Sequence, residues 1–178
     1  MKKGLIATFI GVLVAATGIP VATASAAPYC GITWGSLPKS APAYSTKQLT
    51  NIRTGQHACY DRMVLDMNGP AAGYDVRYVS NVYADGSGQL ITLTGGAKLQ
   101  IVLKAPAYNP STGTSTYPGV VNGTLPGVNL GGYQTFKSAK FAGSFEGQTT
   151  VGLGVRAQLP FRVLKVDNRV VIDVAHKW

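Results

Sequence analysis

The chain has few of the residues that build catalytic and metal sites. It contains two histidines, His57 and His176, and two cysteines, Cys30 and Cys59. A zinc site takes three protein ligands when it is catalytic and four when it is structural, so two histidines are a poor basis for the zinc centre of a wall-cutting amidase. The sequence also lacks a Gly-x-Ser-x-Gly elbow, a His-Glu-x-x-His helix and a phosphate-binding loop. We therefore predict a protein that is not an enzyme and that has no cofactor and no metal.

Acidic residues are scarce as well, with 7 Asp and Glu against 16 Lys and Arg, which gives a net charge of +9. A surface this basic attracts polyanions such as wall polymers, anionic lipid head groups or extracellular nucleic acid. The basic residues occur singly, however, without a run of Lys or Arg and without interleaved aromatic residues. This scatter argues against a specific nucleic-acid partner and is also compatible with a role in solubility alone.

Residues 1–26 have the pattern of a signal peptide. Two lysines near the start precede an uncharged apolar stretch, residues 4–21, and Ala24-Ser25-Ala26 supplies small residues for cleavage. Cleavage after Ala26 leaves 152 residues with a net charge of +7, without a membrane span, outside the cytoplasm and in reach of the cell wall. The alternative is an uncleaved amino-terminal anchor, because the apolar stretch approaches the length of a membrane span. A glycine and a proline near its end argue against a continuous helix.

The predicted export decides how Cys30 and Cys59 are interpreted. In an oxidising environment a single pair of cysteines tends to form a disulfide, which here closes a loop of 28 intervening residues. Such a bridge contributes about 3–4 kcal/mol by the loop-entropy estimate. Metal binding by the two cysteines and His57 is the alternative, but no second cysteine pair completes a four-ligand site.

Alternating apolar residues and turn residues predict the architecture. Residues 27–58 are punctuated by proline and serine without strand periodicity, and we interpret them as an extended arm or linker. Residues 59–178 predict an all-β domain, a small β-sandwich of about eight strands without a helix. The Asp167-Asn168 pair predicts a two-residue hairpin turn between the last two strands. The predicted strands are residues 60–67, 74–79, 90–93, 98–104, 133–142, 149–157, 161–166 and 169–175.

Three features leave alternatives open. Residues 106–132 are rich in Pro, Gly, Ser, Thr and Asn and too long for a simple connection, so they form either a ligand-facing flap or an insertion without a role. Residues 151–155 place glycine at alternate positions, and the bare strand face is covered either by an aromatic ring from a neighbouring strand or by a ligand. Glu146, the only glutamate, lies in a turn where it accepts backbone amide bonds or pairs with Arg156.

Two segments near opposite ends of the chain share the pattern Arg, apolar, Val, apolar, Asp, apolar. They are Arg62–Met67 and Arg169–Val174, and each places Arg and Asp on one face of a strand, which indicates two related halves. Asp66 and Asp173 are the one arguable carboxylate pair for a glycosidase. Since each aspartate has an arginine four positions away, ion pairs along or across the strands are the simpler interpretation.

These segments, together with the final hairpin at residues 160–174, resemble the AMIN fold, a domain named for amidases that cut the bacterial cell wall. Residues 145–156 resemble more closely the AMIN-like domains of secreted and lipid-anchored actinobacterial proteins. The resemblance covers about residues 59–176. It implies a sandwich of two small, symmetry-related β-sheets that docks on the cell envelope, with peptidoglycan as the ligand in the better understood relatives.

A wall ligand of this kind offers carboxylates or phosphates, which Arg and Lys bind. We predict a secreted, non-catalytic module that binds peptidoglycan or an anionic wall polymer. The alternative is a protein-interaction module for another secreted or envelope protein, which would add a strand to a free sheet edge. The candidate ligand-binding residues are Arg62, Lys140, Arg156, Arg162 and Arg169.

Overall fold

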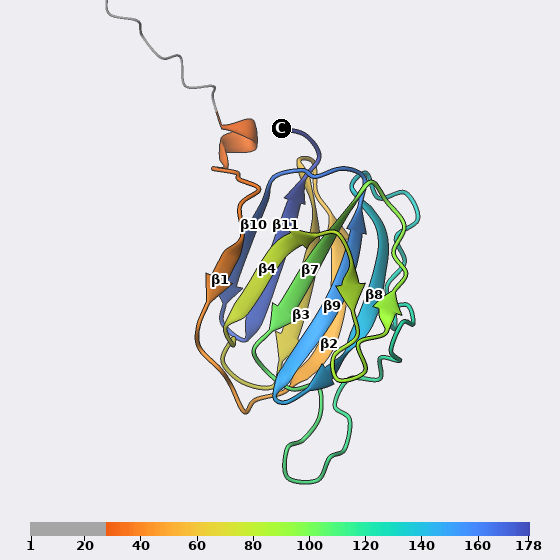
Figure 1. The fold of residues 1–178 in the computed structure, drawn as a ribbon. Coiled ribbons are helices and arrows are strands. Elements are labelled where there is room, and N and C mark those ends of the chain that lie inside the picture. Colours follow the sequence, from red (N-terminus) through yellow and green to blue (C-terminus); the bar gives the residue numbers. More distant parts are fainter. Residues whose placement is uncertain (1–27) are drawn as a thin grey trace, which may run out of the picture.

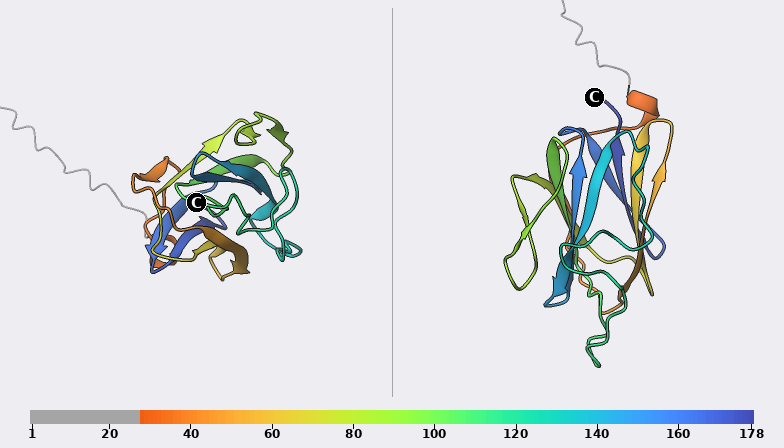
Figure 2. Two further views of the ribbon diagram at one scale, coloured as in Figure 1. Left: turned by 90° about the horizontal axis from the view of Figure 1, so that it is seen from below. Right: turned by 90° about the vertical axis from the view of Figure 1, so that its right-hand side faces the viewer.

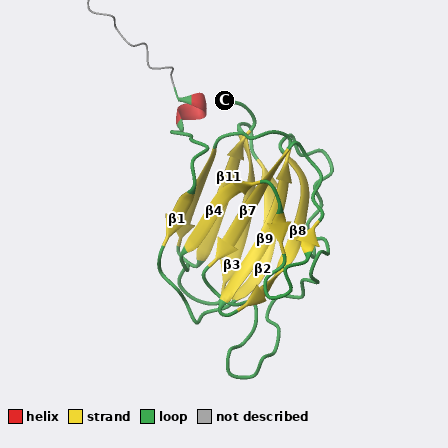
Figure 3. Cartoon of the chain, viewed as in Figure 1, coloured by secondary structure: helices red, strands yellow, loops and turns green. Residues whose placement is uncertain are grey.

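The computed structural model describes residues 28–178, and the predicted signal peptide lies outside this part of the chain. Within it the only helical element is a short 3₁₀ turn, η1 (Tyr29–Gly31), and the remaining elements are strands (Figures 1 and 3). The prediction of an all-β protein is confirmed. The strands are β1 (Lys39–Ala41), β2 (Leu49–Gln56), β3 (Tyr60–Met67), β4 (Tyr74–Val79), β5 (Val82–Tyr83), β6 (Leu90–Ile91), β7 (Ala97–Leu103), β8 (Phe136–Phe145), β9 (Gln148–Val155), β10 (Phe161–Val166) and β11 (Arg169–Ala175).

The strands form a sandwich of two antiparallel sheets. One sheet has five strands in the order β1-β4-β7-β9-β8, and the other has four in the order β10-β11-β3-β2. The edge-on view in Figure 2 shows the two layers, with the short hairpin of β5 and β6 outside the larger sheet. The described residues hold eleven strands rather than about eight. The three strands that were not predicted are β1, β2 and β5, of which β1 and β5 are only two or three residues long, too short for an alternating pattern to be visible.

Strands β1 and β2 lie in the segment that the sequence suggested to be an irregular arm. Strand β2 reads Leu-Thr-Asn-Ile-Arg-Thr-Gly-Gln, and only its Leu49 and Ile52 are buried. It is the edge strand of its sheet and pairs with β3 along its length, with an irregularity between Leu49 and Asn51. A half-exposed edge strand needs few apolar residues, which is why β2 has no clear hydrophobic signature.

The core lies between the two sheets and follows from the alternation within each strand. Leu99, Ile101 and Leu103 of β7 are fully buried, as are Met63 and Leu65 of β3 on the facing sheet. The side chains between them on the same strands point to the outer faces. The outer face of each sheet therefore carries the polar residues that are available for a ligand.

The chain between β4 and β7 covers part of the outer face of the five-stranded sheet, where β9 carries its alternate glycines. A Cβ at Gly152 would lie 2.9 Å from Leu93 Cδ1, and one at Gly154 would collide with the carbonyl oxygen of Thr94. A second small core of Val82, Ala84, Ile91, Leu93 and Ala142 forms here. The covering groups are thus aliphatic side chains and backbone, instead of the aromatic ring that was one expectation.

The long segment 106–132 packs against both edges of the sandwich. Leu49 of β2 donates its backbone N–H to the carbonyl of Pro106 at 2.8 Å, and Asn122 donates to the carbonyl of Phe141 on β8 at 2.8 Å. Tyr117 and Leu125 are buried in the main core. In Figure 1 part of this segment runs beside β8. Its described structure therefore fits a closure of the sandwich between β2 and β8 and does not resemble a free flap.

Candidate binding face

The two segments with the repeated Arg and Asp pattern are neighbours in one sheet. Strands β3 and β11 pair antiparallel, with Arg62 opposite Asp173, Val64 opposite Val171 and Asp66 opposite Arg169. A local twofold axis between the two valines relates each Arg–Asp pair to the other. The internal repeat thus lies within the four-stranded sheet, where it places both aspartates and both arginines on the outer face.

Four arginines and two aspartates form what we call the arginine face, the outer side of the four-stranded sheet. Its members are Arg53, Arg62, Arg162, Arg169, Asp66 and Asp173. The register explains the clustering, because β10 brings Arg162 opposite Asp173 and β2 brings Asn51 opposite Asp66, two residues from Arg53. Four positive and two negative side chains give this face a local charge of +2.

Asp173 is the centre of the more buried cluster. Arg62 donates to its two carboxylate oxygens at 2.6 and 2.9 Å, and Arg162 donates from Nε at 2.8 Å. The carboxylate is fully buried, whereas the two arginine side chains are 27% and 26% exposed. The hydrogen bonds to Asp173 raise the pKa of the Arg62 guanidinium above its ordinary value. A buried carboxylate held by two guanidiniums is satisfied, and the arginines keep their outer N–H groups toward solvent.

Asp66 holds the other pair of arginines closer to the surface. Arg53 binds it in bidentate fashion at 2.8 and 3.1 Å, and Arg169 lies 3.5 Å away. The Arg53 and Arg169 side chains are 51% and 44% exposed. The hydrogen bonds to Asp66 raise the pKa of Arg53. These two guanidiniums are positioned by one carboxylate but remain accessible to a ligand.

A pocket of about 300 Å³ lies between the two clusters. Arg53, Arg62 and Arg169 line it together with His57, and Val64 and Val171 supply apolar surface. The two valines are each 5% exposed, so they form a floor beneath the charged groups. The arginine pocket therefore combines three guanidiniums with an apolar base, which suits an anion that carries a small apolar group.

Aromatic residues extend the arginine face at the end where β3 begins. The guanidinium of Arg162 lies 5.5 Å from the Trp34 ring and 5.3 Å from the Tyr60 ring, within cation–π range. Trp34 belongs to the segment before β1, which the disulfide between Cys30 and Cys59 ties to the start of β3. The predicted disulfide is confirmed, and it holds an aromatic side chain beside the arginines.

The structure brings together three of the five predicted ligand-binding residues, namely Arg62, Arg162 and Arg169. Lys140 lies on β8 of the other sheet, where its ammonium donates to Asn122 Oδ1 at 3.2 Å. Arg156 follows β9 and donates to the carbonyl of His176. Arg156, which the sequence suggested as one partner for Glu146, therefore contacts a backbone carbonyl instead.

Two members of the arginine pocket, Arg53 and His57, were missed by sequence reasoning. Both belong to the segment that was interpreted as an arm. The alternation of Asn51, Arg53 and Gly55 on one side of β2 is a polar pattern, and it becomes informative only when the pairing with β3 is known.

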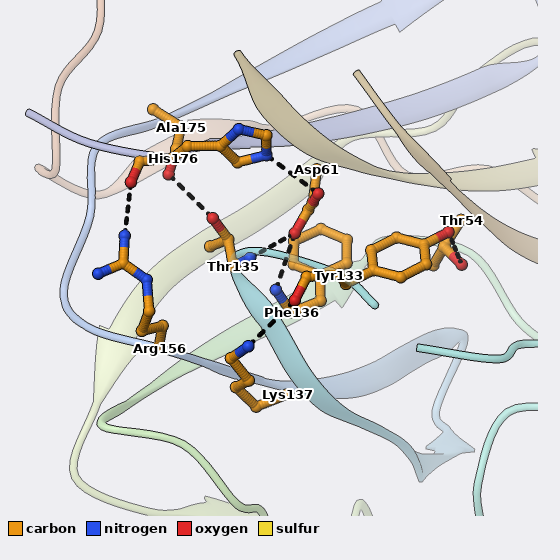
Figure 4. A network of polar contacts seen from close by, with 9 residues as sticks. All are labelled: Thr54, Asp61, Tyr133, Thr135, Phe136, Lys137, Arg156, Ala175 and His176. Carbon is orange, nitrogen blue, oxygen red and sulfur yellow. Dashed lines mark hydrogen bonds and ion pairs between the residues drawn. The ribbon is translucent and has the colours of Figure 1, made fainter. Parts of the chain in front are cut away.

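His176 belongs to a buried network between the sheets (Figure 4). Its Nε2 lies 3.1 Å from Asp61 Oδ1, and the other oxygen of Asp61 accepts the backbone N–H groups of Thr135 and Phe136 at 2.6 and 3.0 Å. Asp61 is fully buried and His176 is 7% exposed. The network joins β3 to the start of β8 and to the end of β11.

The aspartates proposed as an arguable glycosidase pair, Asp66 and Asp173, are each engaged by two arginines, as the ion-pair interpretation predicted. Asp173 is fully buried and cannot reach a sugar. Within residues 28–178, no group of three or more His, Cys, Asp or Glu side chains is arranged to hold a metal ion. The geometry of the arginine face is suited to binding an anion.

Comparison with protein families matches the AMIN-like domain over residues 47–176. The chain belongs to the AMIN-like domain family. The resemblance drawn from the Arg and Asp segments is thereby confirmed, and the match begins early enough to include β2. Comparison with curated proteins and with solved structures gave no match. In the part of this AMIN-like protein that is described, no helix has the length and apolar character needed to cross a membrane.

Proposed function

We propose that this AMIN-like domain is a secreted, non-catalytic module that binds peptidoglycan, or a polymer associated with it, through the arginine face. The observation that carries the proposal is the arginine pocket, where Arg53, Arg62 and Arg169 surround a floor of two valines. Stem peptides of peptidoglycan that end in alanine, and lactyl groups that carry no peptide, present a carboxylate beside a methyl group. The guanidiniums match the carboxylate, and the valine floor matches the methyl group.

Asp66 and Asp173 hold the arginine side chains in place before a ligand binds. A free arginine side chain loses rotamer freedom when it binds, and this loss reduces affinity. On the arginine face, Asp66 and Asp173 already hold all four guanidiniums by hydrogen bonds or ion pairs. Each guanidinium has five N–H donors, of which the aspartate uses one or two. The remaining donors can bind a ligand without a new ordering step.

Retention on wall material tests the proposal. The purified protein is incubated with peptidoglycan that retains its teichoic polymers and with peptidoglycan from which they have been removed, across a salt series. We expect retention on both materials, with weakening as salt rises because exposed charges are screened. Absence of retention on either material at low salt would refute the proposal and would favour the alternative, an interaction with another secreted protein.

Substitution of the exposed arginines locates the site. Arg169→Ala and Arg53→Ala each remove one guanidinium from the pocket, and each should weaken retention about tenfold, the equivalent of one charge-assisted hydrogen bond. The matched control is Lys47→Ala, which removes the same unit charge at an exposed position outside the arginine face. If all three variants weaken retention equally, the protein binds through its overall charge and the pocket has no special role.

A further inference from the structure

A second hollow lies on the opposite side of the sandwich from the arginine face. It has a volume of about 410 Å³ and lies on the outer face of the five-stranded sheet. Arg77 of β4, Gln100 of β7 and Thr150 of β9 line it, since all three alternate with buried core residues. Phe145, the last residue of β8, and Asp85, between β5 and β6, line it as well. We call this site the polar hollow.

Asp85 provides an unused acceptor in the polar hollow. Its Oδ1 accepts a hydrogen bond from the Thr150 hydroxyl at 3.0 Å. Its Oδ2 is buried and has no hydrogen-bond partner among the described residues. Burial raises the pKa of this carboxyl group above its ordinary value. A buried acceptor without a donor is unfavourable, so a ligand that brings a donor to Oδ2 would gain binding free energy.

The other polar groups of the hollow include both hydrogen-bond donors and hydrogen-bond acceptors. Arg77 and Asp75 form an ion pair at 2.8 Å, and both line the site together with Lys104 and Glu146. Gln100 and Gln148 each offer an amide N–H₂ donor and a carbonyl acceptor. Acceptors and donors that alternate in this way match hydroxyl groups, which donate and accept at once. They match a single ion poorly, because one half of the groups would repel it.

Phe145 gives the polar hollow an apolar surface. This residue is 52% exposed and lines the hollow. The ring packs against Gly86, where a Cβ would lie 3.3 Å from Phe145 Cγ. Gly86 also has φ +77°, a conformation that favours glycine. The turn thus lets the backbone support the ring, and a flat apolar ring matches the C–H face of a pyranose.

We propose that the polar hollow binds a neutral saccharide. The sugar ring packs on Phe145, its hydroxyl groups pair with Arg77, Asp75 and Gln100, and one hydroxyl donates to Asp85 Oδ2 once a rotation of this side chain opens the buried oxygen to the hollow. This site is separate from the arginine face and does not depend on the function proposed for it, because the two lie on the outer faces of different sheets.

Titration of the purified, isotope-labelled protein with soluble oligosaccharides tests this proposal by NMR. The probes are hexasaccharides of N-acetylglucosamine, of β-linked glucose and of α-linked glucose, which share hydroxyl chemistry but differ in shape and in the acetamido group. We expect at least one probe to shift the backbone amides of Phe145, Gln100 and Thr150. Absence of shifts with all three probes, or shifts confined to another surface, would overturn the proposal.

Two variants make the test specific. Phe145→Ala removes the ring from an exposed position, and Asp85→Asn keeps the shape of the side chain while replacing the free acceptor by a donor. Each should weaken saccharide binding about tenfold, and the dispersed spectrum of each variant shows whether it is folded. Saccharide affinity unchanged in both variants would overturn the assignment of the ligand to this hollow.

Arg169→Ala is the matched control from the other face. It should leave saccharide binding unchanged while it weakens retention on the wall. The two proposals therefore fail separately: loss of the saccharide site leaves the effect of Arg169 on wall retention, and loss of the wall site leaves the NMR shifts at Phe145.

Discussion

Replacement of Asp61 by alanine should be among the most destabilising single changes in the domain. One oxygen of this buried carboxylate, Oδ2, accepts the backbone N–H groups of both Thr135 and Phe136, and both of these residues are fully buried. Asp61→Ala leaves two donors without partners in the interior. Each unpaired buried donor costs about 1–3 kcal/mol, so we expect the free energy of unfolding to fall by about 4 kcal/mol.

Urea denaturation measures this loss, with a check that the slope of the unfolding free energy against urea concentration is unchanged. For a domain of this size, about 4 kcal/mol corresponds to a fall in the melting temperature on the order of 10 °C. Amide hydrogen exchange provides a local measure, because the Thr135 and Phe136 amides should lose protection first. A loss of less than about 1 kcal/mol with an unchanged slope would refute the reasoning, since water or a shifted backbone would then be satisfying both amides.

Asp61→Asn is the control that separates hydrogen bonding from charge. Its side-chain oxygen can take the place of Oδ2 and accept the same two amides, while its N–H₂ group faces His176. We expect this variant to lose less than half as much stability as Asp61→Ala. Equal losses would show that the negative charge beside His176, and not the acceptor for the two amides, stabilises the fold.

Three further predictions follow from other parts of the structure. Burial raises the pKa of Tyr78 to about 12; because unfolded tyrosine ionises near pH 10, the unfolded chain loses the proton first, and stability should fall as pH rises from about 10 to 12. Denaturation measured across this range should show a smaller fall for Tyr78→Phe. Paired Cys30→Ser and Cys59→Ser substitutions should lower the free energy of unfolding by about 3 kcal/mol in urea denaturation, and a loss near zero would show that the loop is ordered without the bond. Gly154→Ala should cost about 1–3 kcal/mol in the same assay, because the new methyl group meets the backbone at Thr94, and a neutral result would mean that the segment between β6 and β7 moves away easily.

Four strands of six to eight residues, β3, β4, β10 and β11, were predicted to the residue. Strands β3, β4 and β10 begin and end at the predicted residues, and β11 follows the Asp167-Asn168 turn as expected. Asp167 has φ +52°, a positive value of the kind that two-residue hairpin turns require. In these segments the local pattern and the tertiary environment agree, because one face of each strand is core.

Other elements depend on contacts that the sequence does not display. Strand β8 starts three residues later than predicted, since Tyr133 and Thr135 belong to the connection that contacts β2 and Asp61. The ordered course of residues 106–132 depends on hydrogen bonds to two distant edge strands. Composition alone describes such a segment only as rich in turn residues.

Contacts between distant segments also decided how much of the candidate site could be predicted. Arg62, Arg162 and Arg169 lie on strands with strong signals, and the repeated pattern already suggested that aspartates pair with Arg62 and Arg169. Arg53 lies on an edge strand whose register is set by its pairing with β3, including the irregularity near Asn51. The polar hollow unites residues from four strands and two turns, and no short segment of the sequence contains enough of it to be noticed.

The placement of the two sites decides how they would act together. The arginine face and the polar hollow lie on outer faces of different sheets, with the whole core between them. A packed core without an alternative arrangement gives no mechanism for one ligand to change the affinity for the other, so the two sites should bind independently. If both ligands are parts of one polymer, binding at the first site raises the effective concentration at the second, and retention should exceed either single affinity. Free oligosaccharide would then reduce retention on intact wall material only to the level that the arginine face gives alone. The Phe145→Ala variant should show this lower retention from the start, and added oligosaccharide should not reduce it further.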